Sequence, residues 1–225
     1  MGYSRLLDAS GYAAGIAAFV LMAKRRRLLT DGVLSLMIVG LLGGLVCAAL
    51  GQWLIAHAPG KSVIAGLAGG YLSVAIAKRA LGIRRPLGDL FAIALTAGEA
   101  VGRWGCFFAG CCYGRASSLP WSVWQHGAHR HPAQIYSSLA SLCMLAVLLW
   151  FESRRPPENS VFYLQGLLFC GFRFALEFVR EGATGPLGLT AAQWACLAGS
   201  AFFAYRFRGL MRSATERIRI SAPEG

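Results

Sequence analysis

Seven long apolar segments constrain the fold of this chain more than any other feature of its sequence. They cover roughly residues 8–24, 33–57, 62–82, 87–102, 133–151, 161–179 and 187–205. A helix crosses the apolar core of a bilayer in about 20 residues, whereas a membrane β-barrel is built from alternating segments of about ten residues. Only 14% of the residues are charged, against about 25% in soluble domains. The sequence therefore predicts an all-α, polytopic membrane protein, a bundle of about seven transmembrane helices that forms a single domain over residues 1–225.

Basic residues between these segments predict the orientation of the bundle. Fifteen of the 22 lysines and arginines lie in four clusters, at residues 24–27, 78–85, 154–155 and 206–219. All four fall on one side if the segments alternate, and cytoplasmic loops carry an excess of Lys and Arg. We therefore expect the N-terminus outside, and the C-terminus with a basic tail, residues 206–225, in the cytoplasm.

The same distribution explains the net charge of +12 without a nucleic acid partner, because basic loops contact anionic lipid headgroups. The first cluster, Lys24 to Arg27, follows the first apolar segment instead of preceding it. We therefore expect an uncleaved helix there and not a signal peptide.

Glycines recur at a spacing of four residues in three of the apolar segments. The pairs are Gly11 with Gly15, Gly40 with Gly44, and Gly66 with Gly70. Small residues at this spacing let membrane helices approach closely, so we expect tight helix packing at these positions.

Seven cationic residues lie outside the four clusters and against the charge trend. They are Arg5, Lys61, Arg103, Arg115, Arg130, Arg173 and Arg180. In the expected topology all of them are on or near the outer face. An arginine within a membrane segment costs about 3 kcal/mol on insertion scales, and guanidinium groups bind phosphate with two hydrogen bonds. We therefore expect a site for an anionic ligand, such as a lipid phosphate, on the outer side.

Two sets of charged residues have helical spacing. Arg173, Glu177 and Arg180 are at i, i+4 and i+7, which puts them on one helical face. An ion-pair ladder that fixes the register of the helix is one interpretation; a phosphate clamp formed together with Arg103 is the interpretation we favour. Glu99 and Arg103 are also four residues apart, and they could pair without any functional role.

Three cysteines lie close together in the outer segment, Cys106, Cys111 and Cys112. Their spacing is irregular for zinc, and three histidines follow: His126, His129 and His131. A disulfide from Cys106 to either later cysteine is an alternative outside the cytoplasm. We assign no metal ion and no cofactor.

His131 begins the segment that leads into the fifth apolar region. Pro132 suits a first helical position, so His131 would lie at the outer interface as a cap or a solvated residue. An imidazole side chain is also suited to proton transfer near neutral pH.

These pieces together resemble the prolipoprotein diacylglyceryl transferase family of bacterial inner-membrane enzymes. The matching motifs are Gly102-Arg103-x-Gly105-x-Phe107 followed by Gly110 and Gly114-Arg115, then Arg130-His131-Pro132-x-Gln134-x-Tyr136, then Arg173-Phe174-x-x-Glu177-Phe178-x-Arg180-Glu181. Asp89, fourteen residues before Arg103, also matches a family position. The motifs occur in order and cover most of the chain.

The resemblance implies an activity and roles for residues. Family members move the diacylglyceryl group of phosphatidylglycerol to the cysteine thiol of a prolipoprotein signal peptide; glycerol phosphate leaves and a thioether forms. Catalytic roles are then expected for Arg103, Arg173, Glu177 and His131, with the two arginines on the phosphate and Glu177 orienting Arg173. Substrate-binding roles are expected for Arg115, Arg130, Arg180, Gly102, Gly105, Gly114, Tyr136 and Cys106. The implied location is the bacterial cytoplasmic membrane, and the implied partners are phosphatidylglycerol or a similar anionic phospholipid and a prolipoprotein signal peptide.

The chain also departs from the family pattern. Cys106 replaces an asparagine, Ala109 a second asparagine and Cys111 a glutamate, and Ser137 follows Tyr136 where the family has glutamate. The family's third-helix His-Gly-Gly falls on residues 64–69, which contain no histidine.

These departures put in question the group that activates the acceptor. His131, Lys61 or a cysteine could act as the base. A relative with another acceptor, and a thiol- or metal-based membrane protein that binds anionic phospholipid, are alternatives. A third is a small transporter or lipid-binding protein without catalysis.

Overall fold

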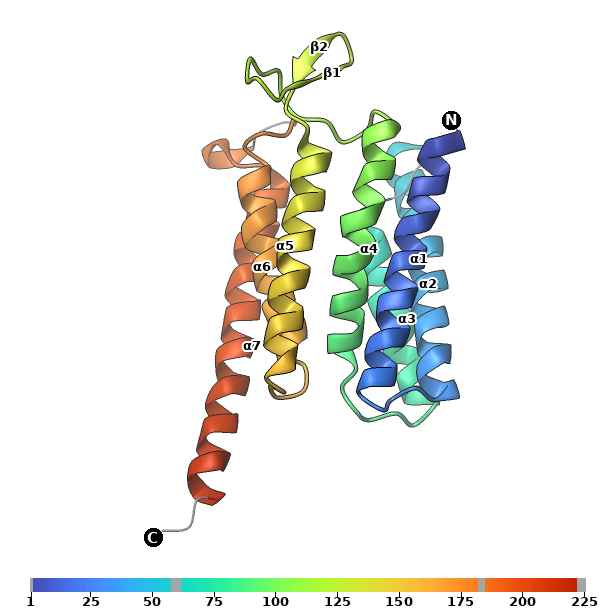
Figure 1. Ribbon diagram of the computed structural model, residues 1–225, viewed down its shortest axis with the longest axis vertical. Coiled ribbons are helices and arrows are strands. Elements are labelled where there is room, and N and C mark those ends of the chain that lie inside the picture. The colour runs from blue at the N-terminus through green and yellow to red at the C-terminus, as the bar shows by residue number, and fades with distance from the viewer. Residues whose placement is uncertain (1, 58–61, 182–184, 222–225) are drawn as a thin grey trace. The chain divides into compact units, whose positions relative to one another are not determined.

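The computed structural model describes residues 2–57, 62–181 and 185–221 and is helical except for one hairpin (Figure 1). Over these ranges it has seven α-helices: α1 (Gly2–Arg25), α2 (Asp31–Ala56), α3 (Val63–Ala80), α4 (Gly88–Phe108), α5 (Ala133–Ser153), α6 (Ser160–Leu176) and α7 (Ala191–Ser221). Strands β1 (Val123–Gln125) and β2 (Ala128–Arg130) pair antiparallel, and a short 3-10 helix, η1, covers Pro186–Gly188. The helical fold class is confirmed, whereas seven membrane crossings and their orientation stay predictions.

The chain forms two compact units. The first comprises Met1–Ala18 and Leu87–Gly225, and the second comprises Phe19–Pro86. The first unit therefore holds α4 to α7 and the hairpin, and the second holds α2 and α3. The single domain over residues 1–225 stays a prediction.

Glycines bring α2 and α3 together in the second unit. A Cβ on Gly44 would lie 3.2 Å from the carbonyl oxygen of Gly66, and a Cβ on Gly70 would lie 3.1 Å from that of Gly40. The predicted close packing at these glycines is confirmed. In the first unit, a Cβ on Gly11 of α1 would lie 2.7 Å from the Cα of Gly102 in α4, so the same prediction holds there.

The side chains of α5 are arranged as in a membrane helix. Its buried face carries Ser137 and Ser138, whereas Leu139 and Leu142 are exposed. The Ser138 hydroxyl donates to the carbonyl oxygen of Ala100 in α4 at 2.5 Å. Among the described residues, three helical segments are long and apolar enough to cross a membrane: Tyr3–Arg25, Asp31–Leu54 and Ala133–Ser153. Polar contacts inside and leucines outside fit a membrane protein.

Asp89 joins the beginning of α4 to the beginning of α6. Its carboxylate is 2% exposed and accepts hydrogen bonds from the backbone N–H groups of Asn159 and Phe162, both at 2.9 Å. The Asn159 side chain in turn accepts from the N–H of Gly88 at 3.1 Å. Asp89 thus satisfies free N–H groups at the start of a second helix, in addition to lying in the first turn of its own.

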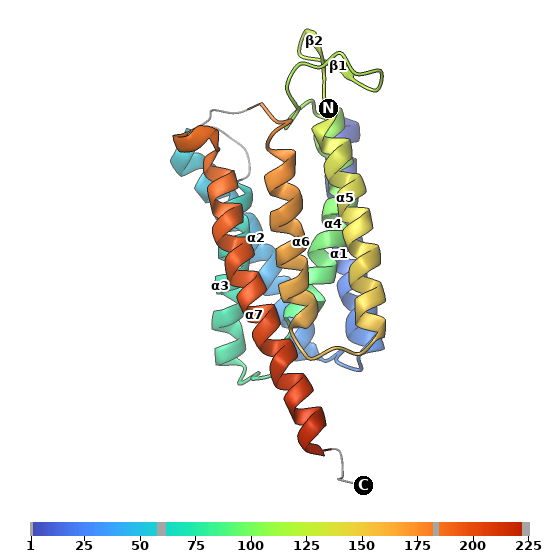
Figure 2. The same ribbon diagram turned by 90° about the vertical axis from the view of Figure 1, so that its left-hand side faces the viewer.

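Three helix ends differ from the sequence prediction. Helix α4 continues to Phe108, so Arg103 and Cys106 lie within it. Helix α7 continues to Ser221, so the expected basic tail is helical up to that residue; α6 and α7 run side by side, and α7 extends past the start of α6 (Figure 2). Helix α6 ends at Leu176, and it is followed by successive turns closed by hydrogen bonds between residues i and i+3. The prediction that Arg180 shares a helical face with Arg173 and Glu177 is therefore wrong.

Candidate functional site

Three sequence motifs meet at one end of the first unit, where the hairpin lies (Figure 1). The segment at residues 114–117 runs between the start of α5 and the end of α6. The N–H of Gly114 donates to the carbonyl oxygen of His131 at 3.1 Å, and the N–H of His131 donates to that of Arg115 at 3.0 Å. On the other side, the N–H of Arg115 donates to the carbonyl oxygen of Val179 at 2.8 Å. Backbone pairing thus fixes the motifs, which are far apart in sequence, against one another.

Gly114 is the residue that allows this approach. A Cβ there would lie 2.6 Å from the Cβ of His131 and 2.7 Å from the carbonyl oxygen of Val179. Gly105 instead faces α1, where its Cβ would lie 2.9 Å from the backbone nitrogen of Asp8. These glycines, together with Gly102, have close contacts inside the chain, and substrate binding by them stays a prediction.

Arg103 and Arg173 each pair with a glutamate of their own helical segment. Arg103 donates to Oε1 of Glu99 from Nε at 3.0 Å and from Nη2 at 2.5 Å. Arg173 pairs from Nη1 with Oε2 of Glu177, the residue that caps α6. The predicted i, i+4 pairs are confirmed. Among the residues that the structure describes, Nη1 of Arg103 and Nη2 of Arg173 have no hydrogen-bond partner, so both keep donors for an anion.

The other three arginines of the motifs surround the paired backbone segments. Arg130 donates to the carbonyl oxygen of Gly114 at 3.4 Å and to Oε2 of Glu181 at 2.7 Å. Its guanidinium lies 4.7 Å from the ring centroid of Tyr113. Arg115 donates from Nε to the carbonyl oxygen of Arg180 at 2.9 Å. Arg130 and Arg115 therefore hold the junction of the motifs together, whatever else they bind.

His131 and Tyr136 form a pair at the entrance to α5. Nδ1 of His131 lies 3.3 Å from the Tyr136 hydroxyl, which accepts a hydrogen bond from Nε1 of Trp121 at 2.8 Å. Helix α5 begins at Ala133, and Pro132 holds the cap position in place of the first helical position that we expected. His131 contributes to the cap through its backbone and not through a side-chain bond.

The three cysteines gather at the end of α4 because of the way that helix terminates. The N–H of Cys111 donates to the carbonyl oxygen of Cys106 at 3.1 Å, and the N–H of Gly110 donates to that of Phe107 at 3.1 Å. With Gly110 at φ +68°, this is the Schellman pattern of helix termination, which favours glycine at that position. It folds Cys111 back over Cys106.

The cysteine sulfur atoms consequently form a compact group. All seven cysteines of the chain are free thiols, and the Sγ atoms of Cys106, Cys111 and Cys112 all lie within 4.8 Å of one another. Hydrogen bonds with the other two thiols lower the pKa of the Cys112 thiol, and the positive charges of Arg180 and Arg103 act in the same direction. Hydrogen bonds with Cys106, the larger effect, and with Cys112 raise the pKa of the Cys111 thiol.

Gln134 is a buried side chain, without a predicted role, that holds the backbone just after α4. It is 1% exposed, and its Nε2 donates to the carbonyl oxygen of Cys111 at 2.6 Å and to Oε1 of Gln125 at 3.3 Å. Its own Oε1 is buried without a partner among the described residues. A glutamine on the buried face of a helix, inside a motif, is the signal that could have identified it.

The three histidines of this region do not join the cysteines. Nε2 of His126 lies 2.6 Å from the carbonyl oxygen of Gly110, and Nδ1 of His129 lies 3.4 Å from the Ser122 hydroxyl. Lys61, another candidate base, lies outside the described residues.

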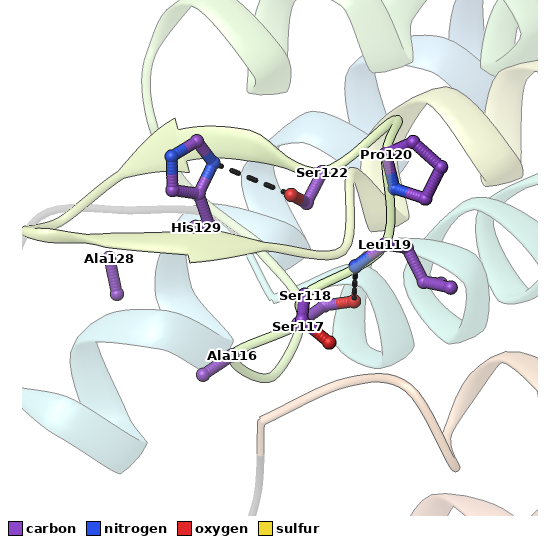
Figure 3. A pocket seen from close by; sticks show the side chains of 8 residues that line it. All are labelled: Ala116, Ser117, Ser118, Leu119, Pro120, Ser122, Ala128 and His129. Atoms are coloured by element: carbon purple, nitrogen blue, oxygen red, sulfur yellow. Dashed lines mark hydrogen bonds between the residues drawn. The ribbon is translucent and has the colours of Figure 1, made fainter.

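One open hollow of about 760 Å³ lies beside the hairpin (Figure 3). Its lining residues are Ala116, Ser117, Ser118, Leu119, Pro120, Ser122, Ala128 and His129. None of the predicted site residues lines it, so the chemistry expected from the sequence is not located there.

Comparisons with known proteins agree with the motifs. A family model described as prolipoprotein diacylglyceryl transferase matches residues 5–207. The chain is 28% identical to the phosphatidylglycerol–prolipoprotein diacylglyceryl transferase of Clostridium tetani (strain Massachusetts / E88), over 80% of this chain and 84% of that protein. It is 28% identical to the protein of the same name from Clostridioides difficile (strain 630), over 81% and 80% of the two chains. With the protein of that name from Methylobacillus flagellatus it shares 37% identity over 57% of this chain and 54% of the relative.

Proposed function

The chain belongs to the prolipoprotein diacylglyceryl transferase family, and we propose that it uses Arg103 and Arg173 to hold the phosphate of phosphatidylglycerol during transfer. It is a membrane transferase of lipoprotein biosynthesis that moves a diacylglyceryl group from phosphatidylglycerol to a prolipoprotein. The acceptor atom is the thiol sulfur of the cysteine in the prolipoprotein signal peptide.

One observation carries the assignment of the site. Residues 114–117 are hydrogen-bonded both to the segment at 129–131 and to Val179, in the turns that follow α6. This junction draws together the motif that contains Arg103 and the motif that contains Arg173.

The transfer needs a positive site for the departing phosphate. The thiolate sulfur attacks the glycerol carbon, a C–S bond forms, and the bond from that carbon to the phosphate oxygen breaks. Glycerol phosphate leaves with the electron pair, so negative charge increases on its oxygens. Preorganised donors in a water-poor site stabilise such charge by about 3–4 kcal/mol each. Arg103 and Arg173 supply these donors.

Glu99 and Glu177 orient the two arginines. Each carboxylate engages one side of a guanidinium and leaves other donors available. Side chains of both pairs are between 10% and 21% exposed, so the arginines are held in place before substrate binds. A pre-oriented donor gains more in the transition state than a flexible surface arginine does.

Substrate contacts are proposed for the remaining motif residues. Arg115, Arg130 and Arg180 surround the junction and give it positive charge. Tyr136, with His131 beside it, lies at the start of α5. Gly114 gives the junction its close backbone packing, whereas Gly102 and Gly105 allow α4 to approach α1.

The proposed location follows from the family and the orientation from the charge distribution. We place the protein in the bacterial cytoplasmic membrane as a multi-pass protein, with the N-terminus outside and the basic tail inside. The motif junction then faces outward, where a signal-peptide cysteine becomes accessible after export.

The test is transfer by the purified protein. Vesicles with phosphatidylglycerol whose diacylglyceryl group carries an isotope label are incubated with the protein and a signal-peptide segment that contains the acceptor cysteine. We expect mass spectrometry to show a labelled thioether on the cysteine, and no product when serine replaces that cysteine. A folded protein that gives no labelled peptide contradicts the proposal.

A second function is favoured by one specific observation, the group of three thiols at the end of α4. In this alternative, the protein uses these thiols to transfer the diacylglyceryl group to another acceptor. It binds phospholipid and leaves the signal-peptide cysteine unmodified. Labelled product on a different thiol in the same assay would identify it.

A further inference from the structure

We propose that Cys106, Cys111 and Cys112 bind a zinc ion whose fourth coordination position takes the acceptor thiol. The proposal rests on the transferase function proposed above, because it assigns the group that activates that acceptor.

The distances between the sulfur atoms fit a single ion. The three Sγ atoms all lie within 4.8 Å of one another, and no other set of three or more potential ligands meets this condition among the described residues. Zn–S bonds of about 2.3 Å at tetrahedral angles put sulfur atoms about 3.8 Å apart. Small side-chain rotations close the remaining difference.

The backbone builds this arrangement without help from a metal. The 3.1 Å hydrogen bond from Cys111 to Cys106 closes the last turn of α4, and Gly110 adopts the positive φ that the turn requires. Cys112 follows with φ +58°. Gln134 of α5 holds the carbonyl oxygen of Cys111 from a buried position. The irregular spacing of the cysteines in sequence is therefore a consequence of one helix end and not evidence against a site.

The ligand count leaves a position open. His126 is engaged with the carbonyl oxygen of Gly110 at 2.6 Å, and His131 lies beside Tyr136 at 3.3 Å. Cys111 and Cys112 are exposed, so an incoming thiol can reach the ion. Zinc sites with three protein ligands and a fourth exchangeable ligand are typical of catalytic zinc, whereas structural sites are closed by four protein ligands.

Neighbouring charges suit the loaded site. Zn²⁺ with three thiolates carries one negative charge, and binding of a fourth thiolate adds another. Arg103 and Cys106 are three residues apart in α4, which makes them neighbours on the helix surface. Arg103 is also the residue that we place on the phosphate, so the acceptor sulfur and the donor phosphate would be held by adjoining groups.

Zinc would activate the acceptor thiol, a role for which residues 64–69 offer no histidine. A thiol that coordinates zinc loses its proton, here to water at the outer face. The bound thiolate then reacts with the glycerol carbon as described above, and the product thioether leaves the ion. No oxidant or reductant takes part, and residues 64–69 need not contain a base.

The first experiment measures zinc without substrate. The full chain is purified in detergent under reducing conditions, together with Cys106→Ser, Cys112→Ser and the control Cys143→Ser, whose exposed cysteine lies on α5. We expect about one zinc ion per chain in the wild type and the control, and strong loss of zinc in the other two variants. Thermal unfolding identifies any variant that fails to fold, and chelation and re-addition of zinc to the wild type gives an answer independent of the variants.

The second experiment observes the open position. Cobalt replaces zinc, and the absorption of the cobalt–thiolate site is recorded with the acceptor peptide and with the serine peptide. We expect only the cysteine peptide to change the spectrum, and chelation to abolish transfer until zinc is restored.

The outcomes separate this proposal from the transferase function. Zinc-free protein that transfers at full rate, or a disulfide among the three cysteines in active protein, overturns the zinc site and leaves the transferase intact. If the spectrum of the cobalt-loaded site does not change when the cysteine peptide is added, the role in acceptor binding is overturned. Zinc binding with peptide coordination but without transfer supports the site and contradicts the phospholipid chemistry instead.

Discussion

The two units of the chain share close helix packing at glycines but differ in the side chains that they bury. In the second unit, α2 and α3 meet through glycines whose backbones approach within contact distance, as at Gly44 and Gly70. In the first unit, polar side chains are buried between helices: among the residues that the structure describes, every buried polar or charged side chain lies there, from Asp89 to Gln193. Buried polar groups are costly unless they are satisfied. Buried polar side chains therefore distinguish the first unit from the second, and the candidate site lies in the first unit.

Removal of the phosphate clamp should have the largest effect. In Arg103→Ala and Arg173→Ala we expect kcat/KM for transfer to fall by about 10²–10³-fold, the usual loss for one preorganised charge-stabilising donor. Arg79→Ala, at an exposed position of the second unit, should retain activity within a factor of two. Equal losses in all three variants would mean that arginine charge acts through the membrane surface and not through a site.

Loss of the buried carboxylate that joins α4 to α6 should be the largest effect on stability. Asp89→Ala leaves two backbone N–H groups without their acceptor, and we expect the free energy of unfolding in detergent to fall by about 3 kcal/mol. The matched change in the second unit, Asp31→Ala in the first turn of α2, removes an exposed charge and should cost less than about 1 kcal/mol. Similar losses for both would erase the distinction between the units.

Glycine substitutions distinguish packing from chemistry. In Gly69→Ala a Cβ would lie 2.2 Å from that of Cys47 in α2, and overpacking of this kind costs about 1–3 kcal/mol. We expect lower stability but normal transfer per folded molecule. In Gly114→Ala the added atom meets His131 and Val179, so both stability and transfer should fall. A fully active Gly114→Ala protein would show that the junction of the motifs is not part of the site.

An exposed ion pair should have the smallest effect. Glu181 pairs with Arg130 at 2.7 Å, but its side chain is 55% exposed. Glu181→Gln should change the free energy of unfolding by less than about 1 kcal/mol and leave transfer within twofold. A loss as large as that of Arg173→Ala would give Glu181 a place in the reaction.

Local features of the site were predictable from the sequence. The pairs Arg103–Glu99 and Arg173–Glu177 follow from helical spacing, and both are present. Apolar segments located the helices, but not their ends: α4 continues past residue 102 to Phe108, and α6 stops at Leu176. Hydropathy has no means of detecting where hydrogen bonding within a helix gives way to turns.

Long-range features were beyond the sequence alone. The hydrogen bond from Arg115 to Val179 joins two segments whose local pattern contains no strand periodicity. The spacing of Arg180 from Arg173 is helical, but spacing does not show that α6 ends at Leu176. The gathering of three thiols depends on Gly110 in a helix-terminating position, a signal that spacing rules for zinc ligands do not include.

Complementation tests the central claim most directly. A strain depleted of its own diacylglyceryl transferase is supplied with this chain, or with the Arg103→Ala, Arg173→Ala double variant, and its lipoproteins are examined by mass spectrometry. We predict a diacylglyceryl thioether on lipoprotein cysteines with the wild type and none with the double variant at equal membrane levels. Unmodified lipoproteins beside well-folded wild-type protein, or full modification by the double variant, would contradict a phosphate clamp at the end of α4 and α6.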